Sequence, residues 1–317
     1  MVTFSCILKA LGLDLIQSDC NYLYRTTWEA EIMRWQLGRR STNVEDRRGT
    51  NVSAPLVGGG IGAALISLVV FLLGGDPSVI WEQNPTSNDN PVTNSPQSTN
   101  SNPQDQMADF VSVVLADTED TWSELFRQNG RTYVEPKLVL YSNAVQSACG
   151  FTRSVVGPFY CPQDEKVYID LSFYRDLRTR YQAPGDFAQA YVIAHEVGHH
   201  VQNLLGISDQ VRVLQNQTSQ TQANQLSVAL ELQADCFAGV WAHHAQRSRQ
   251  ILETGDVEEA LNAASSIGDD RLQEQARGYA VPESFTHGSS AQRVRWFKQG
   301  IQTGDTQQCN TFAGTNR

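Results

Sequence analysis

The chain has 317 residues, of which 40% are hydrophobic, and its net charge at pH 7 is −10. This length is enough to bury a core in one large domain or two small ones. An acidic chain with no long basic run in its second half lacks the clustered positive surface that phosphate binding needs, so we expect no nucleic-acid partner. None of the six cysteines forms a Cys-x-x-Cys pair, which disfavours a zinc knuckle and a thioredoxin-type redox site.

Residues 1–32 show no clear connection to the sequence that follows them. A short basic segment, residues 33–53, begins at Met33 and contains Arg34, Arg39, Arg40, Arg47 and Arg48. One interpretation is that translation starts at Met33 and that residues 1–32 are a gene-model extension. N-terminal sequencing tests this interpretation, because a peptide from residues 1–32 would refute it.

Residues 54–75 contain no charged side chain ("APLVGGGIGAALISLVVFLLGG"). As a helix they reach about 33 Å, which is enough for the hydrocarbon core of a bilayer. The alternative, a secretory signal peptide, has a shorter apolar core nearer the start of the chain. The segment therefore predicts one transmembrane helix. Because the arginines precede it, the positive-inside bias predicts a bacterial inner-membrane protein with residues 33–53 in the cytoplasm and the C-terminal part outside.

Residues 76–106 are rich in Asn, Ser and Pro. Such a composition cannot repay the entropy of ordering, so this segment is predicted to be a disordered tether. Residues 107–317 form the predicted globular domain. Within it, the spacing of apolar side chains predicts a helix at 107–128, a short strand at 137–142 and a half-buried strand at 166–174.

The next predicted helix, of about 19 residues, lies between Asp186, expected as its N-cap, and Gly206. It contains the pattern His195-Glu196-x-x-His199. The two histidines are one turn apart on one face, so both can bind one Zn²⁺ at about 2.0–2.1 Å. Glu196 lies beside them, in position to take a proton from a water molecule rather than to bind the metal.

An alternative interpretation of this motif is an exposed helix with scattered histidine and glutamate. The preceding residues, Tyr191 to Ala194, are apolar, and polar groups on a buried helix need partners. This favours the metal site. His200 lies about 100° around the helix from His199 and is expected to face away from the metal.

A second apolar helix is predicted at residues 226–244. It carries Glu231 and Asp235, one turn apart on one face. Glu231 can complete the zinc ligands and leave one position open, as a catalytic zinc requires. Asp235 can accept the free ring N–H of a ligand histidine and so fix its orientation. The alternative is a pair of solvated acids, which the apolar neighbours disfavour. His243 and His244, near the helix end, are not expected as ligands.

The pattern H-E-x-x-H followed by a helical E-x-x-x-D resembles the gluzincin metallopeptidases. The segments "NVEDRRG", "GPFYCP", "VYIDLSFY", "AHEVGHHVQ", "ELQADCFAGVWA", "IGDDRLQ" and "SFTHGSSAQRVRWF" together resemble the bacterial neutral zinc metallopeptidase family. This resemblance runs from about Met33 to the C-terminus. It implies an α+β, mainly helical, zincin-like domain with a small sheet. It also implies one zinc ion bound by His195, His199 and Glu231, with Glu196 as the catalytic glutamate.

The expected function is therefore that of a membrane-anchored zinc peptidase, attached through residues 54–75, which hydrolyses peptide bonds with Glu196 as general base. His287 is the candidate donor to the oxyanion that forms on the substrate. Arg293 and Tyr160 are alternative donors, and His287 could instead cap the next helix. The strand at 166–174 is expected to hold an extended substrate by edge pairing.

Four cysteines lie in the predicted domain, and two disulfides are expected if it lies outside the cytoplasm: Cys149–Cys161 and Cys236–Cys309. Buried free thiols are the alternative. Two other functions stay open, a zinc-dependent amidase acting on cell-wall peptides and a non-catalytic scaffold, although a scaffold has no need of Glu196. The sequence defines the substrate only as a peptide or protein, and it leaves the oligomeric state open.

Overall fold

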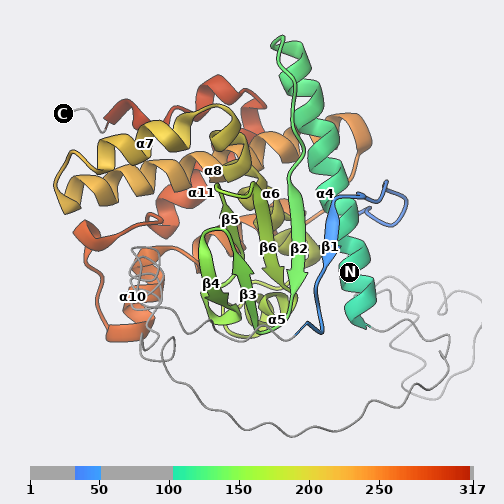
Figure 1. The fold of residues 1–317 in the computed structure, drawn as a ribbon, viewed down its shortest axis with the longest axis horizontal. Helices are drawn as coiled ribbons and strands as arrows, with labels where there is room; N and C mark the ends of the chain where they lie inside the picture. Colours follow the sequence, from blue (N-terminus) through green and yellow to red (C-terminus); the bar gives the residue numbers. More distant parts are fainter. Residues whose placement is uncertain (1–32, 51–102, 315–317) are drawn as a thin grey trace, which may run out of the picture. The chain divides into compact units, whose positions relative to one another are not determined.

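The computed structural model describes residues 33–50 and 103–314, and all of them belong to one compact unit that begins at Met33. Its helices are α4 (Pro103–Gln128), α5 (Ser172–Thr179), α6 (Asp186–Leu204), α7 (Ile207–Gln215), α8 (Gln220–Arg249), α9 (Asp256–Ser266), α10 (Asp269–Arg277) and α11 (Ser290–Thr303). Its strands are β1 (Val44–Asp46), β2 (Lys137–Tyr141), β3 (Ala144–Ser147), β4 (Gly150–Arg153), β5 (Phe159–Cys161) and β6 (Lys166–Asp170). Short 3₁₀ turns are η2 (Ser154–Val156), η3 (Pro282–Ser284), η4 (Thr306–Cys309) and η5 (Thr311–Gly314). Helices predominate over two small sheets (Figure 1), which confirms the predicted α+β, mainly helical class.

No helix in residues 33–50 or 103–314 is both long and apolar enough to span a membrane. The predicted transmembrane helix at 54–75 lies outside the described residues, and so does most of the predicted tether at 76–106. The end of that tether is described, and there the prediction is wrong, because residues 103–106 form the first turn of α4. An acidic side chain in this turn suits the helix N-terminus.

Four strands form the main sheet in the order β1-β2-β6-β5. Strands β1, β2 and β6 run parallel, and β5 is antiparallel to β6. Strand β6 is therefore interior, so the expected edge pairing of substrate with residues 166–174 is wrong; the edge on that side is β5. Strand β6 also ends early, at Asp170, because α5 starts at Ser172. Tyr174 and Leu177, three residues apart, form the buried face of that helix.

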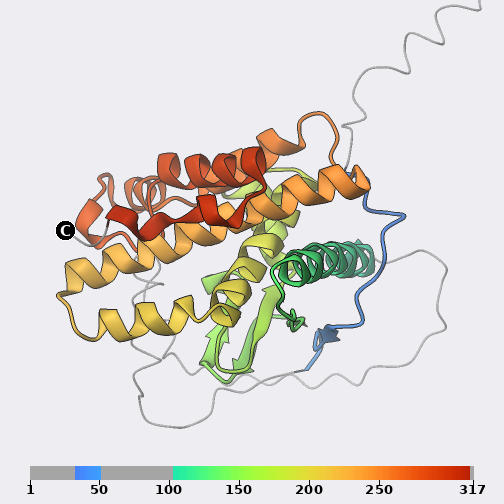
Figure 2. The ribbon, with the colours of Figure 1, turned by 90° about the horizontal axis from the view of Figure 1, so that it is seen from above.

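Helix α6 contacts β5 and β6 on one side and α8 on the other (Figure 2), and most of its side chains are buried. Its N-cap is Gly185, one residue before the predicted cap, and Asp186 is its first residue. It ends where predicted, before Gly206, whose φ of 74° is left-handed. Where α6 crosses α8, a Cβ on Gly198 would lie 3.0 Å from the carbonyl oxygen of Ala234. This close crossing brings the histidines of α6 next to the acids of α8.

Helix α8 is longer than predicted, because Ser219 caps it in a capping box with Gln222. Helix α11 crosses α8 with backbone in contact with backbone. A Cβ on Gly239 would lie 2.3 Å from the carbonyl oxygen of Phe297. A Cβ on Gly300 would lie 2.0 Å from another carbonyl oxygen, on α8. Only glycine fits at these two positions.

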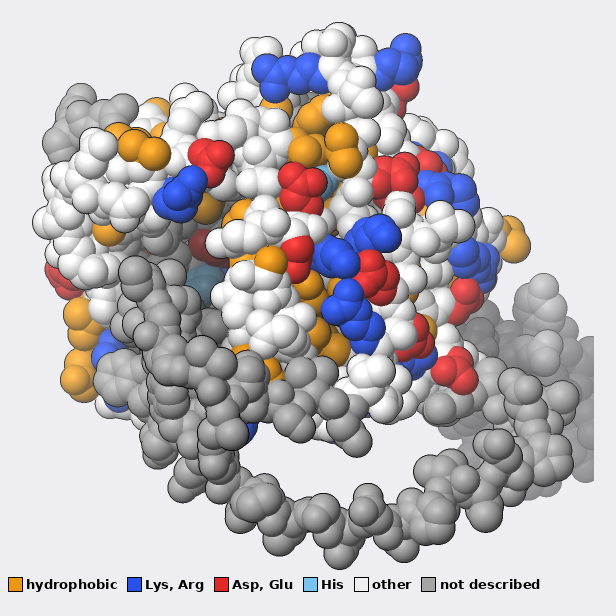
Figure 3. Space-filling model, in the orientation of Figure 1, with side chains coloured by type: hydrophobic (Ala, Val, Ile, Leu, Met, Phe, Trp, Pro, Cys, Tyr) orange, Lys and Arg blue, Asp and Glu red, His pale blue; other side chains and the backbone are white. Residues whose placement is uncertain are grey.

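Residues 33–50, predicted as a separate basic head, are instead part of the folded domain. Strand β1 pairs with β2, and the Met33 side chain lies in the core with 1% exposure. Arg39 and Arg40 form ion pairs of 2.6–2.8 Å with acids of α4. Figure 3 shows basic and acidic side chains intermixed on the side where Figure 1 places β1 and α4. Basic side chains of this segment therefore form ion pairs with acids of the same folded domain.

This packing conflicts with the predicted membrane topology. A single span at 54–75 would leave residues 33–53 and 107–317 on opposite faces of a membrane, where β1 could not form hydrogen bonds with β2. An arrangement with the first part inside and the second part outside is therefore incompatible with this sheet.

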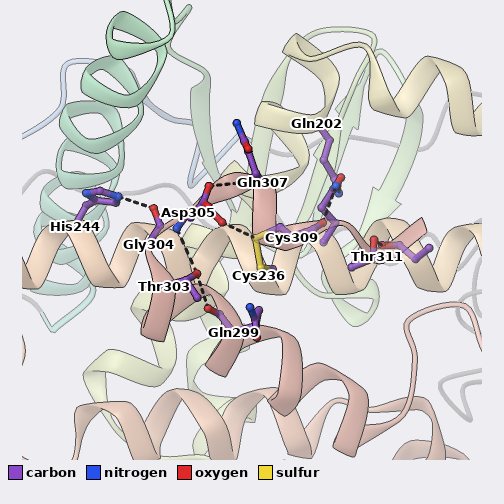
Figure 4. The surroundings of a disulfide bond; sticks show 12 residues. Gln202, Cys236, His244, Gln299, Thr303, Gly304, Asp305, Gln307, Cys309 and Thr311 are labelled. Carbon is purple, nitrogen blue, oxygen red and sulfur yellow. Dashed lines mark hydrogen bonds between the residues drawn. A yellow bond between two sulfur atoms is a disulfide. The ribbon is translucent and has the colours of Figure 1, made fainter. Parts of the chain in front are cut away.

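Both predicted disulfides are present. Cys149–Cys161 joins the turn of the β3–β4 hairpin to β5. Cys236–Cys309 joins α8 to the C-terminal segment (Figure 4). The side-chain amide of Gln233 also donates to the carbonyl oxygen of Cys309 at 3.0 Å. The C-terminal segment is thus fixed to the helix that carries Glu231 and Asp235.

Replacing Cys236 and Cys309 together with serine is expected to lower the free energy of unfolding by about 4 kcal/mol, because their sequence separation is 73 and stabilisation grows with loop length. The same change at Cys149 and Cys161, with a separation of 12, is expected to cost about 3 kcal/mol. Urea denaturation of the two double variants measures both losses. A larger loss for the shorter loop would contradict the explanation by loop closure.

Candidate metal centre

Three side chains from two helices converge on one point: His195 and His199 of α6, and Glu231 of α8. The Nε2 atom of His195 lies 3.2 Å from one carboxylate oxygen of Glu231. The Nε2 atom of His199 lies 3.4 Å from the other. Two ligands that are each 2.0–2.1 Å from a tetrahedral zinc ion are about 3.4 Å apart. The arrangement therefore fits one zinc ion with three protein ligands.

The hydrogen bonds of the two imidazole rings explain why this point needs a cation. His195 Nδ1 lies 2.8 Å from Asp235 Oδ1, which can only accept. His199 Nδ1 lies 2.9 Å from Gln202 Oε1, and the Gln202 amide is oriented by Nε2, which donates to a backbone carbonyl of α8 at 2.7 Å. Each Nδ1 therefore carries the hydrogen, so in the neutral ring Nε2 presents a lone pair to Glu231. Two nitrogen lone pairs and a carboxylate that face one another are all acceptors, so a cation between them would stabilise the arrangement.

The electrostatic interactions between the imidazoles and Glu231 also favour a cation at this point. Burial alone would lower the pKa of His199, but the Glu231 carboxylate outweighs it and raises that pKa to about 9. Burial alone would raise the pKa of Glu231, but the two imidazoles hold it well below its usual value. The carboxylate thus stays ionised, and a metal ion and protons compete for the same Nε2 lone pairs.

Asp235 is fully buried and holds the ring of His195 from behind. Its other partners are the Tyr191 hydroxyl, which donates to Oδ1, and Arg293. The Arg293 Nε and Nη2 atoms donate to the two carboxylate oxygens, each at 2.9 Å. Burial would raise the pKa of Asp235, but the charges of Arg293 and His195 lower it to about 2. Asp235 is thus an ionised acceptor, as its predicted role requires, and Arg293 is committed to it.

Glu196 follows His195 and lines the same cavity, with 8% exposure. Its carboxylate is not part of the three-residue group that could hold a metal. Burial raises the pKa of Glu196, although the neighbouring His195 and His199 act to lower it. A carboxylate beside the ligands with a raised pKa is suited to accept a proton.

His287 lies on the loop before α11 and lines this cavity too. Asp269 accepts from the His287 backbone N–H at 2.6 Å, and its Oδ1 lies 3.2 Å from His287 Nδ1. Burial would lower the pKa of His287, but Asp269 raises it. The alternative that His287 caps α11 is wrong, because Ser289 is the N-cap. With Nδ1 bound to Asp269, Nε2 is the ring nitrogen left for a ligand.

Asp269 and Asp270 lie in "IGDDRLQ", one of the segments that carry the family resemblance, and no role was predicted for either of them. The Asp269 carboxylate also accepts from the backbone N–H of Thr286 at 2.7 Å and of Gly288 at 3.1 Å. Asp270 accepts from the backbone N–H of Ser290 at 2.7 Å. The two acids therefore fix the loop that carries His287. The sequence signal was only a pair of acids at a helix start.

The other histidines take no part in the group of ligands. His200 faces away, as expected, and is fully buried. Its Nε2 donates to the carbonyl of Val134 at 2.7 Å, so Nδ1 accepts from the Tyr160 hydroxyl at 3.0 Å. This bond uses the hydroxyl hydrogen of Tyr160 and disfavours it as an oxyanion donor. His243 and His244 bind carbonyl oxygens at the end of α11, each at 2.8 Å.

The candidate ligands face a cavity of about 640 Å³. Figure 3 shows a recess on this face in which histidine surface is visible. One wall is formed by β5, and another by α7. Away from the polar groups the lining is largely apolar and aromatic, with Val156, Pro158, Phe159, Phe173, Tyr181, Val192 and Leu230. An apolar cleft with a few polar groups at one place is typical of a small-molecule or peptide site.

Comparison with known proteins agrees with this geometry. The family model described as "Putative neutral zinc metallopeptidase" matches residues 33–312. The uncharacterized protein YpfJ of Escherichia coli K12 is 53% identical over 286 residues, which are 88% of this chain and 99% of YpfJ. The uncharacterized protein Rv2575 of Mycobacterium tuberculosis is 45% identical over 194 residues, 58% of this chain and 64% of Rv2575. No solved structure is similar to the chain at a significant level.

Proposed function

Since the chain belongs to the neutral zinc metallopeptidase family, we propose that it is a zinc-dependent peptidase that hydrolyses peptide bonds in the cavity beside His195, His199 and Glu231. One observation carries the proposal: two imidazole lone pairs and one carboxylate face each other at 3.2–3.4 Å, on a wall that also holds an uncoordinated glutamate. A purely structural zinc site is usually closed by four protein ligands. Three ligands and a neighbouring base favour catalysis.

The residues of the chain divide the work of hydrolysis. A bound zinc ion supplies a Lewis acid, which lowers the pKa of a water molecule and polarises a carbonyl group. Glu196 accepts the proton of the attacking water and can return it to the leaving amine. His287 donates from Nε2 to the carbonyl oxygen that becomes negative. Asp235, held by Arg293, keeps the His195 ring in its tautomer.

The edge strand β5 supports a binding mode for an extended peptide. Phe159 and Tyr160 of this strand line the cavity, and within residues 33–50 and 103–314 β5 pairs with β6 on one side and with no strand on the other. A peptide backbone can add to such an edge by main-chain hydrogen bonds. The Tyr160 hydroxyl, bound to His200 on α6, fixes the distance between this edge and the helix that carries the candidate ligands.

Removing the metal tests the proposed function. The purified chain is expected to contain about one zinc ion, to cleave an unfolded protein substrate, and to lose this activity with a chelator until zinc is added back. Elemental analysis and peptide mapping of the products measure both properties. Cleavage of cell-wall peptides alone would assign an amidase instead. A purified chain that binds zinc but cleaves neither substrate class would favour the scaffold.

Replacing His287 with asparagine is expected to lower kcat by about 10²-fold to 10³-fold, the usual effect of losing one oxyanion donor, with zinc content unchanged. Asparagine can still bond to Asp269, so the loop is expected to stay in place. Steady-state kinetics with zinc analysis make the measurement. An unchanged kcat would remove His287 from the reaction.

We also propose that the domain works outside the cytoplasm, because its two disulfides persist only in an oxidising compartment. Residues 33–50 then lie outside as well, since β1 belongs to the same sheet. Cysteine labelling of whole cells at an engineered position of that segment tests this placement. Labelling only after the inner membrane is permeabilised would contradict it.

A further inference from the structure

A second group of acids lies at the opposite end of α6 from Gly206. Asp186 begins α6, Asp256 begins α9, and Glu259 follows one turn later on α9. One carboxylate oxygen from each lies within 4.8 Å of the others. Glu259 also accepts from the backbone N–H of Phe187 at 3.1 Å, so this group adjoins the N-terminus of the helix that carries the candidate zinc ligands. Burial and the charges of Asp186 and Asp256 raise the pKa of Glu259 to about 7.

The backbone nitrogen of Met33 lies against this acidic group, 3.3 Å from Asp186 Oδ1. Two features hold it there. The Met33 side chain is 1% exposed in the core, and the next backbone N–H, of Arg34, donates to the carbonyl of Ile251 at 2.9 Å. The Arg34 side chain pairs with Glu253 on the same loop. The backbone N–H of Glu253 in turn donates to Asp256 at 2.9 Å, so Met33 lies between the starts of α6 and α9.

We propose that the working chain begins at Met33 and that its α-ammonium group is the cation bound by Asp186, Asp256 and Glu259. A peptide nitrogen at this place offers one N–H and no charge. A free α-amino group has a pKa near 7.7–8.0, so at neutral pH it is largely an ammonium with three donors. Such donors make strong, charge-assisted hydrogen bonds to carboxylates.

Two further observations support the same starting residue. The compact unit begins at Met33, and the family model matches from residue 33 onward. The ammonium site thus accounts for three carboxylates gathered beside one backbone nitrogen. It does not depend on the peptidase activity, because the acidic group is separate from the candidate zinc ligands.

The first test is the mass of the N-terminal peptide of the protein isolated from its own cells. We expect a peptide that starts at Met33 with an unblocked amine. A retained residue before Met33, or a blocked Met33 in most molecules, would overturn the proposal. The second test compares melting temperatures of chains produced from Met33 and from Met1. The chain with the free ammonium is expected to melt about 4 °C higher, because charge-assisted hydrogen bonds to the carboxylates stabilise the folded state more than one neutral N–H does.

A substitution within the acidic group separates this effect from ordinary loss of packing. In the chain that starts at Met33, Glu259→Gln removes a partner of the ammonium and is expected to lower the melting temperature by several degrees. In the chain that starts at Met1, it removes a mutually repelling carboxylate, so the melting temperature stays constant or rises. Glu258→Gln, on the exposed face of α9, is the matched control and is expected to change neither. An equal decrease in both chains upon Glu259→Gln would overturn the proposal. Zinc content is measured throughout, because a failure of the metal site would show there and not in this comparison.

Discussion

Replacing Glu196 with glutamine is expected to lower kcat on a verified peptide substrate by about 10²-fold to 10⁴-fold, while zinc binding stays near the wild-type level. The reason is that the amide keeps the size of the side chain but cannot accept the proton of the attacking water. The Glu196 carboxylate is not among the groups that converge on the metal position, so the ligands are retained. Steady-state kinetics and elemental analysis on the same preparation measure the two properties.

The matched control for this variant is Glu258→Gln, which makes the same chemical change on an exposed surface of α9. It is expected to leave both kcat and zinc content unchanged. If Glu196→Gln cut the substrate at the original rate, Glu196 would not be the base. If it lost zinc as well, Glu196 would be a ligand and the three-ligand assignment would be incomplete.

Replacing Glu231 with alanine is expected to weaken zinc binding by more than about 100-fold, beyond the usual range for a residue that only supports a ligand. This carboxylate supplies both oxygens that face the imidazoles of His195 and His199. Competition with a chelator of known affinity measures the loss, and activity is expected to fall with it. Circular dichroism checks that α8 is still formed.

Asp235→Asn provides the graded comparison for Glu231→Ala. The amide can still accept from His195 Nδ1 but carries no charge, so zinc affinity is expected to fall about 10-fold to 100-fold. The order of the two effects is the informative outcome. A larger loss for Asp235→Asn than for Glu231→Ala would mean that Asp235, and not Glu231, reaches the metal.

The sequence was sufficient for the parts of the candidate site that depend on helical periodicity. His195 and His199 share a face because they are four residues apart, and Glu231 and Asp235 share one for the same reason. That the two faces meet could be inferred only from their apolar neighbours. The structure supplies the specific cause, which is the close approach of Gly198 to Ala234.

The parts that could not be predicted depend on partners far away in the sequence. The arginines at positions 39 and 40 read as a cytoplasmic charge cluster because their partners, Glu119 and Asp109, lie on a helix that begins about 60 residues later. The alternation of apolar and polar residues also led to a wrong prediction after Asp170, where residues 171–174 were expected to continue the strand but α5 starts at Ser172. Over so few residues, the end of a strand and the start of a short amphipathic helix can show the same sequence pattern. An alternation with a period of two that covers only four residues does not distinguish a strand from a helix.

The crossing of α8 and α11 at Gly239 and Gly300 also determines which side of the cleft can move. A carbonyl oxygen of the partner helix lies only 2.0–2.3 Å from the position that a Cβ would take at either glycine. The two helices are therefore packed too closely to slide past each other or separate. Arg293 and Glu231 therefore belong to a stationary wall. Opening of the cleft to admit and release a peptide is therefore expected to come from β5, whose main contacts outside its sheet are with α6, whereas α7 packs directly against α8. Hydrogen exchange is thus expected to be faster in β5 than along the α8–α11 contact.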